Sequence, residues 1–162
     1  MQAGFYNHPV SQIELAETHI SLVFLTGDFA YKVKKPVNFG FLDFTQLNRR
    51  KYYCEEELRL NGRLAADIYL DVVAITESNG KLQLNGQGDI VEYAIRMRQF
   101  DTHGLFSQLI DKNSITLQHI DTLAERLASF HSSIQVSASD AEFGTANAVI
   151  YPVNQNFDIL QS

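Results

Sequence analysis

The chain has 162 residues, of which 45% are hydrophobic and 20% charged, and its formal net charge at pH 7 is −6. This length suits one domain, or one lobe plus the start of another, and the hydrophobic content excludes an intrinsically disordered protein. The negative charge argues against general binding of nucleic acid, which requires a basic surface. A single cysteine, Cys54, excludes an internal disulfide and a cysteine-rich zinc site.

Nothing in the sequence directs the chain to a membrane. No apolar run approaches the length needed to cross a bilayer. Residues 1–9 lack the basic and then apolar order of a signal peptide. We therefore expect a cytoplasmic protein without a membrane partner.

The first elements expected along the chain are two paired strands. Residues 20–25 and 29–34 are strand-like and flank the turn-forming pair Gly27-Asp28, a pattern that predicts a β-hairpin. Pro36 ends the second strand, because proline has no N–H to donate to a ladder.

A helix and three further strands follow the hairpin. Thr45 is expected to cap a helix over about 46–64, which carries Leu47, Cys54, Leu58 and Ala65 on one side at helical spacing. The strand-like segments after it are 69–75, 81–84 and 90–97, the last two joined by a turn-rich stretch at 85–89. The sequence thus predicts an α+β fold: a twisted, mostly antiparallel sheet of about five strands with one helix packed on it.

The character of the chain changes after Phe100. A short helix is expected at 105–110 and a longer amphipathic helix at 116–131, with Ile120, Leu123, Leu127 and Phe130 three and four residues apart. From Ser132 onward polar residues dominate, and we expect an irregular segment over 132–162. The apolar stripe of the longer helix is expected to be poorly buried and to favour self-association.

The second strand of the hairpin carries a candidate binding pair. Side chains alternate along a strand, so Ala30 and Lys32 share a face. A small residue beside a lysine leaves room for a flat ring next to a cation that reaches a phosphate, as in the kinase template with its lysine on the third strand. The competing interpretation is a solvated basic strand end, in which Lys32, Lys34 and Lys35 face water.

The partner of that lysine is sought among three consecutive acids, residues 55–57. Their side chains point about 100° apart around the helix. Glu57 lies at the edge of the apolar stripe and is the acid that would face a sheet carrying Lys32. Glu55 is the second choice of acid and Lys34 the second choice of lysine. The alternative is that all three acids lie on the exposed surface of the helix and bind nothing.

Several longer motifs resemble a bacterial family of aminoglycoside-phosphotransferase-like proteins. They are Glu17-Thr18-His19-Ile20-Ser21, the run Phe24 to Val37, Phe39-Gly40-Phe41-Leu42-Asp43-Phe44, Cys54 to Asn61 and Glu92 to Arg98. The resemblance covers most of 6–131 and implies a protein-kinase-like N-lobe with ATP bound beneath the sheet.

The resemblance also assigns roles along the chain. Lys32 and Glu57 would orient the phosphates, with Ala30 and Met97 beside the nucleotide and a hinge after Met97. Residues 1–100 would form the ATP-holding N-lobe, 101–131 the hinge and first C-lobe helices, and 132–162 a truncated polar segment. The ligands would be ATP, Mg²⁺ and an unidentified small-molecule acceptor.

The sequence departs from that family in two places. No glycine-rich loop covers the phosphates, because Thr18 to Ser21 occupies its place. No His-Gly-Asp catalytic loop occurs before Ser162, so the Mg²⁺ ligands are expected in a missing C-lobe, which in such proteins is often followed by a P-loop ATPase domain. We therefore expect the chain alone to transfer no phosphoryl group. A nucleotide-sensing regulatory module is the alternative function, and a structural domain without a ligand is a third.

Overall fold

The computed structural model describes residues 5–138, 141–142 and 144–161, so the outer limits of the predicted segments 1–100 and 132–162 lie outside it. The chain divides into two compact units between Ser114 and Ile115. The first unit contains β1 (Glu14–Glu17), β2 (Ser21–Leu25), β3 (Phe29–Lys34), α1 (Leu47–Ala65), β4 (Tyr69–Ser78), β5 (Lys81–Leu84), β6 (Asp89–Arg98), the short 3₁₀ helix η2 (Thr102–Gly104) and α2 (Phe106–Asp111). The second contains α3 (Leu117–Ser133) and α4 (Ala146–Gln161).

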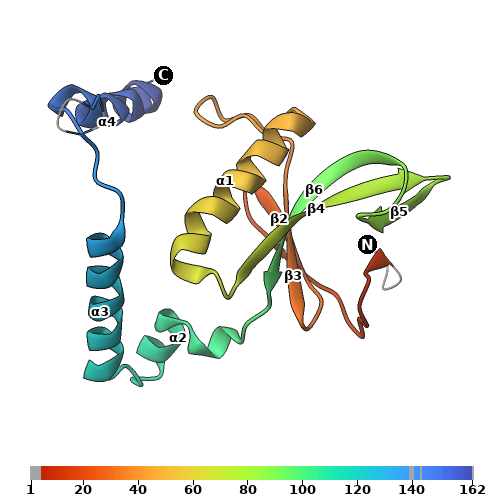
Figure 1. Cartoon of the computed structure of the whole chain (residues 1–162), viewed down its shortest axis with the longest axis horizontal. Helices are drawn as coiled ribbons and strands as arrows, with labels where there is room; N and C mark the ends of the chain where they lie inside the picture. Colours follow the sequence, from red (N-terminus) through yellow and green to blue (C-terminus); the bar gives the residue numbers. More distant parts are fainter. Residues whose placement is uncertain (1–4, 139–140, 143, 162) are drawn as a thin grey trace. The chain divides into compact units, whose positions relative to one another are not determined.

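The strands of the first unit form one antiparallel sheet in the order β1-β2-β3-β6-β4-β5 (Figure 1). The predicted hairpin is confirmed: β2 pairs with β3, and Gly27 takes a φ of +99° in the turn, a conformation that favours glycine. The predicted strands at 69–75, 81–84 and 90–97 are also confirmed as β4, β5 and β6. The α+β class therefore holds.

The two faces of the sheet are covered by different parts of the chain. Direct partners in antiparallel strands share a face, and one face presents Tyr31, Val33, Val73, Ile75 and Ala94 to a buried cluster. Phe5 and Tyr6 from the N-terminal segment complete this cluster. The other face carries Lys32 and packs against α1.

The predicted helix at 46–64 is confirmed as α1, whose buried residues are Arg50 and Cys54. The predicted cap is wrong, because Gln46 is the N-cap residue and its side chain makes no capping hydrogen bond. Thr45 instead donates its backbone N–H and its hydroxyl to Asp43 Oδ1, at 2.9 and 2.6 Å. Thr45 thus contacts the loop before the helix and is not its cap residue.

Within the described residues the sheet has six strands, one more than the approximately five expected. The additional strand, β1, pairs with β2 along the edge of the sheet, and each of its four residues is exposed. Leu15 is the one large apolar residue among them and is 56% exposed. A strand that buries neither face has no alternating apolar pattern to detect.

The predicted irregular segment at 132–162 is also wrong, because α4 occupies Ala146–Gln161. Its apolar residues Val149, Ile150, Val153, Phe157 and Leu160 recur at helical spacing. Pro152 inside the helix and the polar composition around it conceal this period.

The predicted helices at 105–110 and 116–131 are confirmed as α2 and α3. Thr116 caps α3 in a reciprocal arrangement with His119. None of the residues of α3 is buried, and Ile120, Leu123 and Leu127 are 48%, 42% and 40% exposed. The expectation that this stripe is less buried than α1 is confirmed, while self-association through it stays a prediction.

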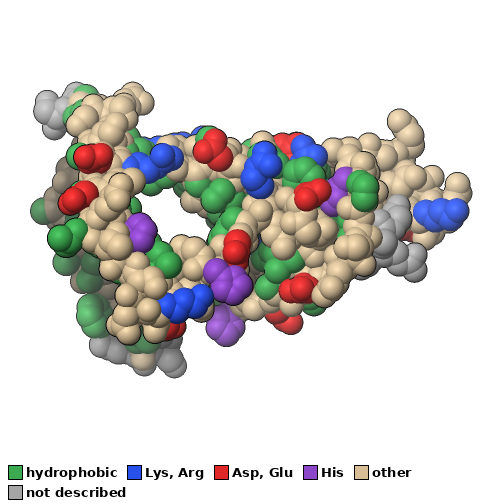
Figure 2. All heavy atoms as spheres, turned by 90° about the horizontal axis from the view of Figure 1, so that it is seen from below, with side chains coloured by type: hydrophobic (Ala, Val, Ile, Leu, Met, Phe, Trp, Pro, Cys, Tyr) green, Lys and Arg blue, Asp and Glu red, His purple; other side chains and the backbone are tan. Residues whose placement is uncertain are grey.

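Charged side chains of both signs are interspersed on the face shown in Figure 2, and hydrophobic side chains reach the surface between them. Within the described residues, no helix is both long enough and apolar enough to cross a membrane.

Candidate functional site

A row of side chains crosses the α1 face of the sheet near the ends of its central strands. Leu25 pairs with Ala30, Ala30 with Met97, and Met97 with Tyr69. Because direct partners share a face, these four side chains lie in line across β2, β3, β6 and β4. The methyl group of Ala30 leaves a low point between the larger side chains on either side.

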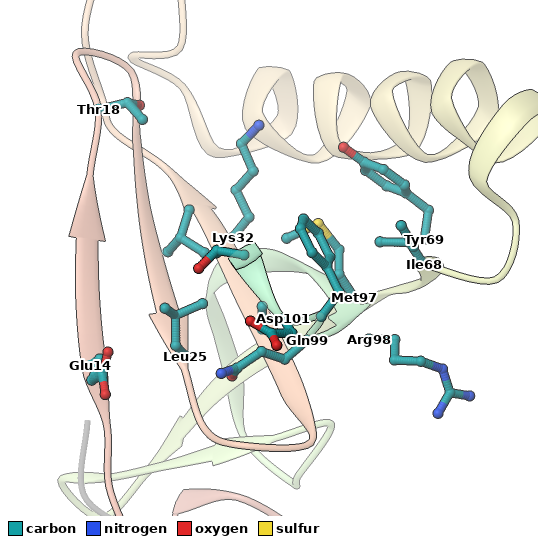
Figure 3. Close-up of a pocket in the computed structure, with 14 residues that line it drawn as sticks. Glu14, Thr18, Leu25, Lys32, Ile68, Tyr69, Met97, Arg98, Gln99 and Asp101 are labelled. Atoms are coloured by element: carbon teal, nitrogen blue, oxygen red, sulfur yellow. The ribbon is translucent and has the colours of Figure 1, made fainter. Parts of the chain in front are cut away.

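A cleft of about 490 Å³ opens over this row (Figure 3). Its size falls in the range of about 300–1,000 Å³ that is usual for small-molecule sites. The residues that line it are Glu14, Thr18, Val23, Leu25, Ala30, Lys32, Ile68, Tyr69 and the run Met97 to Thr102. They combine an apolar floor with a few polar groups at its edges, which suits a flat, partly apolar ligand that carries a charged end.

Lys32 lies two residues beyond Ala30 on the same face and extends toward α1 in Figure 3. Its ammonium donates to Glu57 Oε1 at 2.7 Å. Glu57 Oε2 accepts from Lys34 at the same distance of 2.7 Å. One carboxylate on α1 therefore joins two consecutive lysines on this face of β3.

The surroundings of Glu57 hold its carboxylate in the charged form. The side chains of Lys32, Lys34 and Glu57 are 24%, 4% and 15% exposed. Burial by itself raises the pKa of Glu57, but the hydrogen bonds and charges of the two lysines outweigh that effect, so the pKa lies below its ordinary value. The carboxylate is thus ionised near neutral pH.

A second set of contacts fixes α1 to the sheet beside this cluster. Arg50 Nε donates to Glu92 on β6 at 2.9 Å, and its Nη1 donates to the carbonyl oxygens of Phe44 and Thr45, both at 2.9 Å. The Phe44 ring centroid lies 5.0 Å from the Lys34 ammonium. These contacts set where Glu57 stands over β3.

The segment after β6 closes one side of the cleft. Hydrogen bonds attach it to the residue before β4 and to the turn between β2 and β3. The backbone N–H of Arg98 donates to Ile68 O at 2.8 Å. Gln99 donates its N–H to Asp28 O at 3.0 Å, and its side-chain oxygen accepts from the Gly27 N–H at 3.0 Å. The hairpin turn between β2 and β3 is therefore linked to the segment that follows Met97.

The turn between β1 and β2 lies at the opposite side of the cleft. Thr18 Oγ1 accepts from the backbone N–H of Ser21 at 3.0 Å and from that of Ile20 at 3.4 Å. Lys35 donates to Thr18 O at 2.7 Å and to Glu17. Because these two amides point to a threonine side chain, they are not directed at a ligand.

Three of the four predicted binding residues, Ala30, Lys32 and Met97, line the cleft. The fourth, Glu57, reaches it through Lys32. The second-choice acid, Glu55, is exposed and lies 3.7 Å from Lys51. The competing interpretation, in which the three lysines of 32–35 face water, is wrong. Lys34 is 4% exposed, and each of the three lysines has an acidic partner.

The sequence did not single out the other residues of the cleft. Alternation along β2 places Val23 and Leu25 on the face of Lys32 once the register is known. Gln99 and Asp101 carry no local signal, since they stand in an irregular segment. Lys34 was only a second choice, although its spacing of two from Lys32 predicts the shared face.

The described residues contain no group of three His, Cys, Asp or Glu side chains arranged to hold a metal ion.

Comparison with known proteins gives relatives without an assigned activity. No protein-family model matches the chain, and no solved structure matches it. The chain is similar to the uncharacterized proteins Mb2027c of Mycobacterium bovis and Rv2004c of Mycobacterium tuberculosis. Each is 32% identical over 152 residues, which cover 92% of this chain and 29% of the relative. The chain thus spans less than a third of the length of the curated relatives it matches.

Proposed function

We propose that this chain is the ATP-binding, protein-kinase-like N-lobe of a phosphotransferase that acts on a small molecule. One observation carries the proposal: the Lys32–Glu57 ion pair of 2.7 Å stands at the wall of a cleft of about 490 Å³. Protein kinases place a lysine on the third strand, where it contacts the ATP phosphates and pairs with a glutamate of the following helix. Here the lysine is on β3 and the glutamate on α1, the next helix along the chain.

The cleft suits the two ends of a nucleotide differently. The adenine ring would lie over Ala30, between Leu25 and Met97, where the floor is apolar. The polar groups of the segment 99–101 lie at the edge of that floor. The phosphates would extend toward Lys32, whose ammonium reaches the wall of the cleft. The acceptor and the transfer step belong to parts of the protein beyond this lobe.

Displacement of a fluorescent ATP analogue from the purified chain tests the proposal. Wild type should bind the analogue, and unlabelled ATP should displace it. Lys32→Met should weaken ATP binding by about 10- to 100-fold, because it removes a charged hydrogen bond to phosphate. Lys81→Met is the matched control, since Lys81 is an exposed lysine on β5 away from the cleft, and it should bind ATP as wild type does. Absence of binding by wild type at millimolar ATP, or equal binding by Lys32→Met, would contradict the proposal.

A further inference from the structure

The Glu57 carboxylate has a second cation that the kinase template does not require. Each of its oxygens accepts from a different ammonium, Oε1 from Lys32 and Oε2 from Lys34. Lys32 lines the cleft, whereas Lys34 is 4% exposed and is not among the lining residues. Lys34 therefore cannot contact a ligand in the cleft and acts on it only through Glu57.

The cluster keeps one positive charge. Two ammonium groups and one carboxylate sum to +1, whereas a simple lysine–glutamate pair is neutral. The adjacent ion pair of Arg50 with Glu92 adds no net charge to it. The backbone of the turn at 18–21 offers little compensation for phosphate charge, because the amides of Ile20 and Ser21 donate to Thr18 Oγ1. Side-chain cations thus carry most of the attraction for an anion at this end of the cleft.

We propose that Lys34 is a positioning residue that holds Glu57 so that the Lys32 ammonium can turn to a nucleotide phosphate. When Lys32 shares its ammonium between the phosphate and Glu57, Lys34 still donates to the other oxygen of the carboxylate. The largely buried Glu57 therefore does not depend on Lys32 alone for its neutralising charge. Helix α1 then keeps its place on the sheet with and without nucleotide. Without Lys34, Glu57 would retain Lys32 as its one cation on β3 and compete with the phosphate for it. This inference rests on the proposed ATP site.

The test compares ATP with adenosine, which lacks phosphates, in the same displacement assay. Lys34→Met should weaken ATP binding by about tenfold, and it should change adenosine binding by less than about twofold. A double-mutant cycle with Glu57→Gln separates positioning from packing. In the Glu57→Gln background no carboxylate competes for Lys32, so Lys34→Met should change ATP binding by less than about threefold.

Three results would overturn the role of Lys34: unchanged ATP binding by Lys34→Met, equal losses for ATP and adenosine, or the same loss in both backgrounds. If Lys34→Met does not fold, Lys34→Gln takes its place, since an amide keeps a hydrogen-bond donor near Glu57 without the charge. Lys81→Met again serves as the control. Failure of wild type to bind ATP would overturn both the proposed function and the role of Lys34. If wild type binds ATP and the Lys34 variants bind it equally well, only the role of Lys34 is overturned.

Discussion

At the scale of single residues, the candidate site depends on three charged side chains, Lys32 and Lys34 on one face of the sheet and Glu57 on the helix that covers it. Burying Glu57 costs solvation, which two hydrogen bonds of 2.7 Å from Lys32 and Lys34 offset. Lys34 gains a further contact with the Phe44 ring. A cluster of this kind is maintained only when each member keeps a partner, so its members respond together to substitution and to pH.

The cluster makes stability depend on pH in a predictable direction. The pKa of Glu57 in the folded protein lies below its ordinary value of 4.5. The resulting stabilisation is present above the pKa of the unfolded state and is lost as pH falls through the folded-state pKa. Glu57→Gln removes this stabilisation, so the variant should melt at a lower temperature than wild type at pH 7. The difference between the two melting temperatures should shrink as pH falls below about 4.5.

Thermal unfolding between neutral pH and about pH 3 measures this difference. Glu55→Gln is the matched control, because Glu55 is exposed and its ion pair with Lys51 is long, at 3.7 Å. The melting temperature of this variant should follow that of wild type at every pH. A difference for Glu57→Gln that stays constant across the range would contradict the assignment.

At the scale of elements, α1 is the part that builds the site, because it carries Glu57 and is fixed to the sheet beside it. The Arg50–Glu92 pair joins α1 to β6, and Arg50 also binds the two carbonyl oxygens that precede the helix. Arg50 is 8% exposed. This one guanidinium therefore links the helix, the loop before it and the sheet.

Loss of that guanidinium should destabilise the lobe. Arg50→Met leaves Glu92 and the carbonyls of Phe44 and Thr45 without their donor, and should lower the free energy of unfolding by about 3 kcal/mol. Arg59→Met is the matched control on the same helix, because Arg59 pairs with Glu56 at the exposed surface, and it should cost less than about 1 kcal/mol. Urea unfolding measures both, and equal costs would show that Arg50 does not fix α1.

Periodicity predicts elements whose apolar residues repeat clearly along one face, α3 among them, and it misses β1, which has no such repeat. The hairpin of β2 and β3 follows from two strand-like segments around Gly27-Asp28, and the helix α1 follows from apolar residues at helical spacing. The pairing of Lys32 with Glu57 follows from strand alternation and helical spacing. The edge strand β1 buries neither face and was missed. Thr45 was wrongly predicted as the cap of α1, because it bonds to Asp43 and the helix begins one residue later than a Thr45 cap requires. The cleft itself depends on the register of β6, which no single segment encodes.

At the scale of the whole molecule, the chain has two units, and every residue of the candidate site belongs to the first. The cleft is lined by residues between Glu14 and Thr102, and the cluster around Glu57 lies in the same range. Helices α3 and α4 belong to the second unit. The site should therefore not depend on the second unit.

Deletion of the second unit tests that independence. A chain ending at Ser114 should keep the far-ultraviolet spectrum of a mixed α+β protein and should bind ATP within about twofold of the full chain, because the sheet, α1 and the cleft are retained. If α3 mediates self-association, the shorter chain should also be more nearly monomeric by light scattering, because α3 exposes Ile120, Leu123 and Leu127. Loss of ATP binding in a folded chain of this length would show that the second unit contributes to the site.

In the proposed complex, a nucleotide lies over Ala30 with its phosphates at Lys32. Backbone amide chemical shifts of the isotope-labelled chain, recorded during titration with a non-hydrolysable ATP analogue, test it most directly. Saturable shifts are expected in residues that line the cleft, namely Val23, Leu25, Ala30 and Lys32 on β2 and β3 and the run Met97 to Thr102. Adenosine should shift the amides near Ala30 and Met97 but not those near Lys32. Absence of shifts at millimolar analogue, or shifts confined to the opposite face around Tyr6 and Val73, would contradict it.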